Sequence, residues 1–72
     1  MRIFTTRDDV SKYIELLVAS KDVPLLFDVF VRDTWRSINK TYPSIRASFY
    51  SQLREKGLFD QYIRRVRELG LP

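Results

Sequence analysis

Apolar side chains recur along this chain at spacings of three and four residues, which is the period of amphipathic helices. The pattern predicts helices at about residues 7–20 and 24–40. A third helix is expected to start at Ser44 and to end at Gly57, and a fourth to follow it and end at Gly70. The sequence therefore predicts an all-α fold, a compact bundle of about four short helices.

Polar and helix-breaking residues mark where these helices should begin. Thr5 or Thr6 is expected to cap the first helix, whose first turn then carries two acids. Asp22 is expected to cap the second, with Pro24 in its first turn, where a missing amide hydrogen costs nothing. Ser44 is expected to cap the third, because the proline before it breaks the second helix.

The second segment is apolar around most of its circumference. We expect its water-facing stripe to consist only of Asp28, Arg32 and Arg36. A helix of this kind lies at the centre of a bundle or turns a second apolar side toward a partner. The residues of that second side are Leu25, Leu26 and Val29.

The two ends of the chain are expected to pack differently. Ile3 and Phe4 are predicted to hold an extended arm against the bundle. In the fourth helix, Asp60 and Glu68 each stand four residues from Arg64, a spacing that favours weak surface ion pairs. The fourth-helix residues expected to face water are Arg64, Arg65, Arg67 and Glu68.

A short internal similarity links the two halves of the chain. The letters LFD occur at residues 26–28 and again at residues 58–60, each time after a predicted amphipathic helix. A chain of 72 residues is expected to form a single domain, 1–72, and the similarity is consistent with two tandem helix pairs within it, at 6–40 and 41–72. Chance recurrence of leucine and phenylalanine in helical cores is the alternative.

The composition argues against catalysis. The chain has 72 residues, no histidine and no cysteine, so the commonest general base, nucleophile and transition-metal ligands are missing. Ser-Lys chemistry is formally open, but Ser11-Lys12 has neither a glycine-rich loop nor a predicted pocket beside it. The nine carboxylates are dispersed. We therefore expect a protein without enzymatic activity, metal or cofactor.

The same composition indicates a compartment. Without cysteine there is no disulfide framework, which is typical of a reducing environment. The longest apolar run is too short for a secretory signal or a membrane span. We expect a cytoplasmic protein with no membrane partner.

Positive charge is concentrated in the second half. Residues 1–36 carry six basic and six acidic side chains, whereas residues 37–72 carry seven basic and three acidic ones. The whole net charge of +4 therefore lies in the second half. A concentrated basic surface favours a polyanionic partner through counterion release, although a solvated basic face without a ligand is the alternative.

The third helix combines this charge with small polar side chains. Ile45, Phe49 and Leu53 recur every four residues and form its predicted core stripe. The residues on the opposite side are Ala47, Tyr50, Ser51 and Arg54. A helix that enters the DNA major groove needs slim residues near the bases, hydrogen-bonding tips and cations for guanine or phosphate. This segment supplies all three, which predicts double-stranded DNA as the partner.

We assign base reading to Arg46 and Arg54, on either side of the small residues, and phosphate contacts to the other cations. Each assignment competes with a structural role: a helix cap for Ser44, a core position for Tyr50, surface ion pairs for the arginines. The predicted DNA-binding residues are Lys40, Ser44, Arg46, Ala47, Tyr50, Ser51, Arg54, Lys56, Arg64, Arg65 and Arg67.

With the turn Lys40-Thr41-Tyr42-Pro43 followed by the segment SIRASFYSQLREKG, residues 24–69 resemble the helix-turn-helix or homeodomain-like class of DNA-binding proteins. That resemblance implies that the third helix enters the major groove. A very small, basic, cysteine-free chain with two such units also resembles the archaeal CRISPR DNA repeat-binding proteins. This second resemblance implies a cytoplasmic protein that binds CRISPR repeats and influences transcription across them.

A different class of function is also open. The second apolar side of the second helix would suit a helical protein-interaction module or a small homo-oligomer without a nucleic-acid role. The two hypotheses are compatible, because many helix-turn-helix proteins bind DNA as homodimers. RNA is a less favoured partner, since no row of aromatic side chains offers a base-stacking surface.

Overall fold

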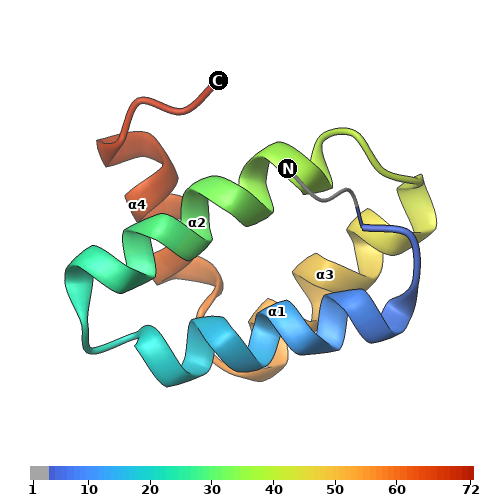
Figure 1. Cartoon of the computed structure of the whole chain (residues 1–72), viewed down its shortest axis with the longest axis horizontal. Helices are drawn as coiled ribbons and strands as arrows, with labels where there is room; N and C mark the ends of the chain where they lie inside the picture. Colours follow the sequence, from blue (N-terminus) through green and yellow to red (C-terminus); the bar gives the residue numbers. More distant parts are fainter. Residues whose placement is uncertain (1–3) are drawn as a thin grey trace.

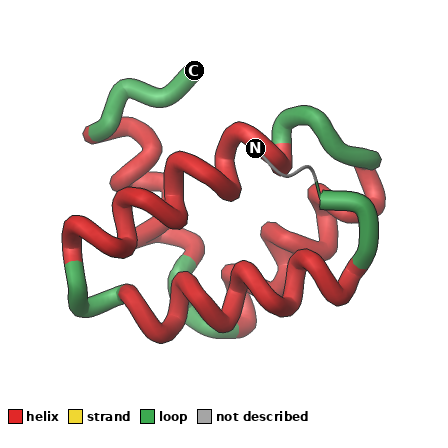
Figure 2. Tube along the Cα trace, viewed as in Figure 1, coloured by secondary structure: helices red, strands yellow, loops and turns green. Residues whose placement is uncertain are grey.

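The computed structural model describes residues 4–72, which form four α-helices (Figure 1). Short connections join them (Figure 2), and this part of the chain contains no strand. The predicted all-α bundle of about four helices is confirmed. The helices are α1 (Arg7–Ser20), α2 (Pro24–Ile38), α3 (Pro43–Glu55) and α4 (Phe59–Glu68).

The helices form two layers in the view of Figure 1, with α1 and α2 in front and α3 and α4 behind them. α1 packs against both α2 and α3, and α4 packs mainly against α2. The molecule measures 27 × 24 × 19 Å. No helix within residues 4–72 has the length and apolar character that crossing a membrane requires.

A series of aromatic contacts joins all four helices through the core. The Phe4 ring lies 5.0 Å from the Tyr13 ring of α1 and 5.6 Å from the Phe49 ring of α3, measured between ring centroids. Phe49 in turn lies 5.5 Å from Tyr62 of α4, and Tyr62 lies 6.3 Å from Trp35 of α2. Phe4, Phe49 and Tyr62 are completely buried. These large rings supply much of the apolar burial that a chain of this size needs.

The segment before α1 packs on the bundle as predicted for Phe4. The Phe4 side chain fills the core, and its carbonyl accepts a hydrogen bond from the Thr41 hydroxyl in the turn between α2 and α3. Phe4 is thus tied to the turn that precedes α3. Ile3, the other residue of the predicted arm, lies outside the described residues.

The start of α1 is a complete capping box, as the sequence indicated. The Thr6 hydroxyl accepts a hydrogen bond from the Asp9 amide, and the Asp9 carboxylate accepts one from the Thr6 amide, both at 3.2 Å. Thr5 donates to the same carboxylate from its amide and its hydroxyl. These bonds, the Thr5 amide first, lower the pKa of Asp9.

Two other predicted caps were wrong. Val23 and Tyr42 occupy the capping positions of α2 and α3, and neither makes a side-chain capping bond. Proline is the first residue of both helices, where its fixed φ already suits the helix and its missing amide needs no partner. Asp22 therefore lies one residue before the cap of α2, and Ser44 lies inside the first turn of α3.

The predicted glycine ends of α3 and α4 are confirmed. Gly57 has φ of 70° and Gly70 has φ of 66°, the left-handed conformation that favours glycine. After α3, the Leu58 amide donates to the Leu53 carbonyl at 2.9 Å, and both side chains are buried. This is a Schellman motif, which turns the chain sharply from α3 into α4.

The two similar LFD stretches occupy different places. Leu26 is the third residue of α2 and is 45% exposed, whereas Leu58 precedes α4 and is buried. The stretches therefore differ in register relative to their helices. The tandem organisation stays a prediction.

Because Phe49 joins the other aromatic rings in the core, Phe49→Ala is expected to lower the free energy of unfolding by about 3–5 kcal/mol. The matched control is Tyr42→Ala, since Tyr42 is 65% exposed and its truncation leaves no cavity. Urea denaturation followed by circular dichroism measures both. Equal losses in the two variants would contradict the central position of Phe49.

Candidate nucleic-acid interface

α3 has the two faces that its sequence predicts. Ala47, Ser51 and Arg54 are exposed on one side, where Ser51 and Arg54 present polar groups to solvent and Ala47 leaves the surface open. Across the helix, a buried stripe packs against the rest of the bundle. Its members are Ile45, Phe49 and Leu53.

The outer face of α3 is poor in negative charge. Glu55 is the one carboxylate in the helix, and it is the last residue. On α1, by contrast, the exposed face carries Asp8 and Glu15 around Lys12. A polyanion can therefore approach α3 with less repulsion than it would meet at α1.

Ser44 is exposed in the first turn of α3 and makes no capping bond. The sequence predicted a helix cap at this position, and that prediction was wrong. Its hydroxyl stands beside backbone amides that no side chain caps, at the positive end of the helix dipole. Ser44 therefore belongs to the exposed surface at the start of α3.

Arg46 does not flank this surface as the sequence suggested. It is half-buried, and its Nε donates to the Ile38 carbonyl at 3.1 Å while Nη2 donates to the Thr41 carbonyl at 3.3 Å. These carbonyls lie at the end of α2 and in the following turn, where helical partners run out. Arg46 therefore fixes the α2–α3 connection.

Tyr50 lies at the border between the core and the surface. It is half-buried, and its ring lies 5.9 Å from Phe49 and 6.1 Å from Phe59. Burial raises the pKa of its hydroxyl. The structure thus gives Tyr50 the packing role that the sequence left as its alternative.

Arg54 is exposed, with its guanidinium over the Phe59 ring at 4.3 Å from the centroid. Phe59 itself is half-buried at the start of α4. A cation held over a ring loses less freedom when it binds a ligand than an unrestrained arginine. Phe59 is thus a supporting residue that helical spacing did not identify, because the contact spans the turn between two helices.

The surface continues from Arg54 onto α4. One shallow hollow is lined by Arg54, Gly57, Phe59 and Asp60, and the next shares Phe59 and Asp60. The further residues of the second hollow are Ile63, Arg64, Arg67 and Glu68. Three of the predicted arginines therefore lie along one strip of surface, with Asp60 between them.

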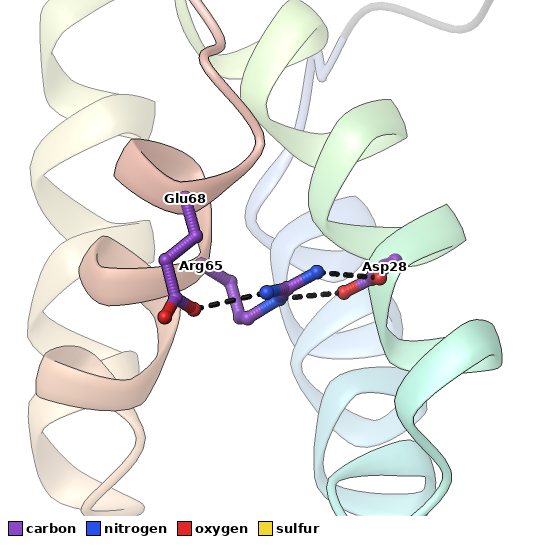
Figure 3. Close-up of polar contacts among 3 residues, drawn as sticks. All are labelled: Asp28, Arg65 and Glu68. Atoms are coloured by element: carbon purple, nitrogen blue, oxygen red, sulfur yellow. Dashed lines mark hydrogen bonds and ion pairs between the residues drawn. The ribbon is translucent and has the colours of Figure 1, made fainter.

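Arg65 is not part of that strip (Figure 3). Its Nε and Nη2 donate to the two carboxylate oxygens of Asp28 at 2.8 and 2.7 Å, and its Nη1 donates to Glu68 at 2.9 Å. The hydrogen bonds from Arg65 hold the pKa of Asp28 below its usual value, and the two carboxylates raise the pKa of Arg65. This bidentate ion pair links α4 to α2.

Four expectations about surface charge are corrected by the ion pairs of Arg65. Arg65 does not simply face water, and Asp28 does not belong to the wet stripe of α2, because each half-buried side chain pairs with the other. Glu68 pairs with Arg65 rather than Arg64. All ion pairs within residues 4–72 involve Arg65, so Asp60 and Arg64 form none.

The two lysines of the predicted site, Lys40 and Lys56, lie at opposite ends of α3. Lys40 is exposed in the turn before the helix, and Lys56 is exposed directly after it. The structure therefore leaves both lysines at the surface, while Arg46 and Arg65 serve the fold.

No group of three or more carboxylates within residues 4–72 could hold a metal ion.

Comparison with protein-family models, curated proteins and solved structures finds no match to this chain.

Asp28 makes its interaction with Arg65 as an anion, so its contribution depends on pH. Its lowered pKa means that this stability is present above the unfolded value, about 3.9, and is lost as pH falls through the folded value. Wild type should exceed Asp28→Asn by about 1 kcal/mol near neutral pH in urea denaturation, and the difference should shrink below about pH 4. Asp33→Asn, at an exposed site on the same helix, is the control. A difference that persists in strong acid would contradict the assignment.

Alanine substitutions of Arg46 and Arg54 should lower the free energy of unfolding by different amounts. Arg46→Ala leaves two carbonyls without their donor and should lower the free energy of unfolding by about 1–2 kcal/mol. Arg54→Ala removes one exposed cation–π contact and should cost about 0.5 kcal/mol. Thermal and urea unfolding of both variants check this, and an equal or reversed order would contradict it.

Proposed function

We propose that this chain binds double-stranded DNA through the outer face of α3, extended onto α4. The observation that carries the proposal is the acid-poor outer face of α3, where small and hydroxyl side chains lie beside exposed cations. This combination is what a helix needs in order to approach base edges and phosphates together. Ala47 leaves room for close approach, and Ser51 and Arg54 supply the hydrogen-bonding groups.

In the proposed complex α3 is the recognition helix of a helix-turn-helix unit that begins with α2. Its 13 residues span about 20 Å, which suits insertion into the major groove. The N-terminal turn, with Ser44 and Ala47, leads into the groove, as is usual for recognition helices. Arg54 lies at the other end of the same face.

Phosphate contacts are proposed for the exposed cations around α3. Lys40 lies before the helix and Lys56 after it, and Arg64 and Arg67 continue the surface on α4. None of the four takes part in an ion pair of the described chain. Arg46 and Arg65 are left out, because their guanidinium groups already serve the fold.

Fluorescence anisotropy with a labelled mixed-sequence duplex tests the proposal. If Arg54 and these four cations each neutralise one phosphate, the slope of log Kobs against log salt should be about −4.5. The double variant Arg64→Ala/Arg67→Ala should make the slope shallower by about 1.8. Lys12→Ala is the control, because Lys12 stands among acids on the outer face of α1.

A second variant tests α3 itself. Ala47→Glu places a carboxylate in the middle of the proposed contact surface, and the exposed position should tolerate the change without unfolding. Binding should fall by at least about a hundredfold while circular dichroism stays unchanged. Absence of binding by the wild type at low salt, or an equal effect of Lys12→Ala, would overturn the proposal.

A further inference from the structure

The outer side of α2 carries apolar residues that the bundle does not cover. Leu25 is 83% exposed, Val29 is 52% exposed and Leu26 is 45% exposed. Val23, directly before the helix, is 50% exposed and extends the patch. Large apolar side chains grouped on one side of a small protein are typical of an interaction surface.

The same side of α2 becomes charged toward its C-terminal end. Helical spacing places Arg32, Asp33 and Arg36 on the face that carries Leu25 and Val29, and all three are exposed. This outer stripe is thus divided, with apolar residues in its first half and charges in its second. The inner face, which includes Phe27 and Val31, is buried in the bundle. We call the exposed face, Leu25, Leu26, Val29, Arg32, Asp33 and Arg36, the α2 stripe.

We propose that the α2 stripe is a homodimer interface, in which α2 packs antiparallel against α2 of a second copy of this chain. A two-fold axis at the level of Phe27 brings together residues that lie equally far before and after it. Leu25 then faces the partner's Val29, and Val29 faces the partner's Leu25. The apolar halves of both stripes cover each other at the centre.

Charge complementarity selects a second copy as the occupant. In the same register Arg32 comes level with the partner's Asp22, which lies in the turn directly before α2, and the two-fold axis makes this approach twice. Arg32 and Asp22 are exposed, and neither takes part in an ion pair of the described chain. The exposed apolar residues at the start of α2 are therefore bounded by Asp22 before the helix and by Arg32, three residues after Val29. That pattern is self-complementary, as a two-fold interface must be.

The size of the surface indicates a reversible dimer. In this register α2 of one copy overlaps α2 of the other from Pro24 to Phe30, which is about 10 Å of helix. A single pair of short helices covers less than the roughly 800 Å² per partner of a standard interface. Association in the micromolar range is the expectation, and it does not depend on DNA binding because the stripe shares no residue with the candidate nucleic-acid interface.

Sedimentation velocity without nucleic acid, from low micromolar to near-millimolar protein, tests the dimer. Wild type should pass from monomer to dimer across this range. Leu25→Asp should weaken association by at least about a hundredfold, because a leucine is lost from both copies and a charge enters the apolar centre. Tyr42→Ser is the control, since Tyr42 is also an exposed large side chain but lies outside the stripe. Circular dichroism checks that each variant keeps its fold.

A charge exchange tests the register. Arg32→Glu places two like-charged pairs across the interface and should weaken association by about tenfold. The double variant Asp22→Arg/Arg32→Glu exchanges the partners and should restore the wild-type dimer. Failure of this rescue overturns the antiparallel register. A wild-type protein that stays monomeric throughout overturns the homodimer and leaves the stripe to a different protein partner.

Discussion

Burial of Phe49 is the constraint on which the arrangement of this small bundle depends. The ring contacts Phe4 before α1, Tyr50 on its own helix and Tyr62 of α4. With no cysteine in the chain, apolar packing must hold the fold together. Because Phe49 is completely buried, α3 cannot rotate about its axis without exposing the ring. The outward direction of Ala47 and Ser51 follows from that restriction.

Two arginines strengthen the contacts between helices and are thereby removed from the binding surface. Arg65 holds α4 to α2 through Asp28, and Arg46 closes the end of α2 onto the following turn. A second polar contact between α2 and α4 is buried: the Tyr62 hydroxyl lies 2.8 Å from the Thr34 hydroxyl, and burial raises the pKa of Tyr62. The basic side chains of the second half therefore form two groups. Arg46 and Arg65 stabilise the fold, and the others are exposed around α3 and on α4.

The exposed surfaces differ in character from helix to helix. α2 presents apolar residues and then mixed charges, whereas α3 presents small polar residues with one acid at its end. The two proposals thus assign self-association and DNA contact to different helices. A two-fold dimer would carry two copies of α3, which is how many DNA-binding proteins recognise two half-sites. The register of α2 would then set the spacing between them.

The sequence by itself determined what depends on neighbours along the chain. Helical periodicity gave the four helices and the buried side of α3, and the glycine ends came from backbone chemistry. The caps of α2 and α3 were also local, since proline at the first helical position was visible in the sequence. Only the tertiary structure decided the partners of Arg46 and Arg65. Asp28 and Arg65 are 37 residues apart, and no periodicity relates positions on different helices. Whether a cation is exposed or paired is fixed only when the helices pack.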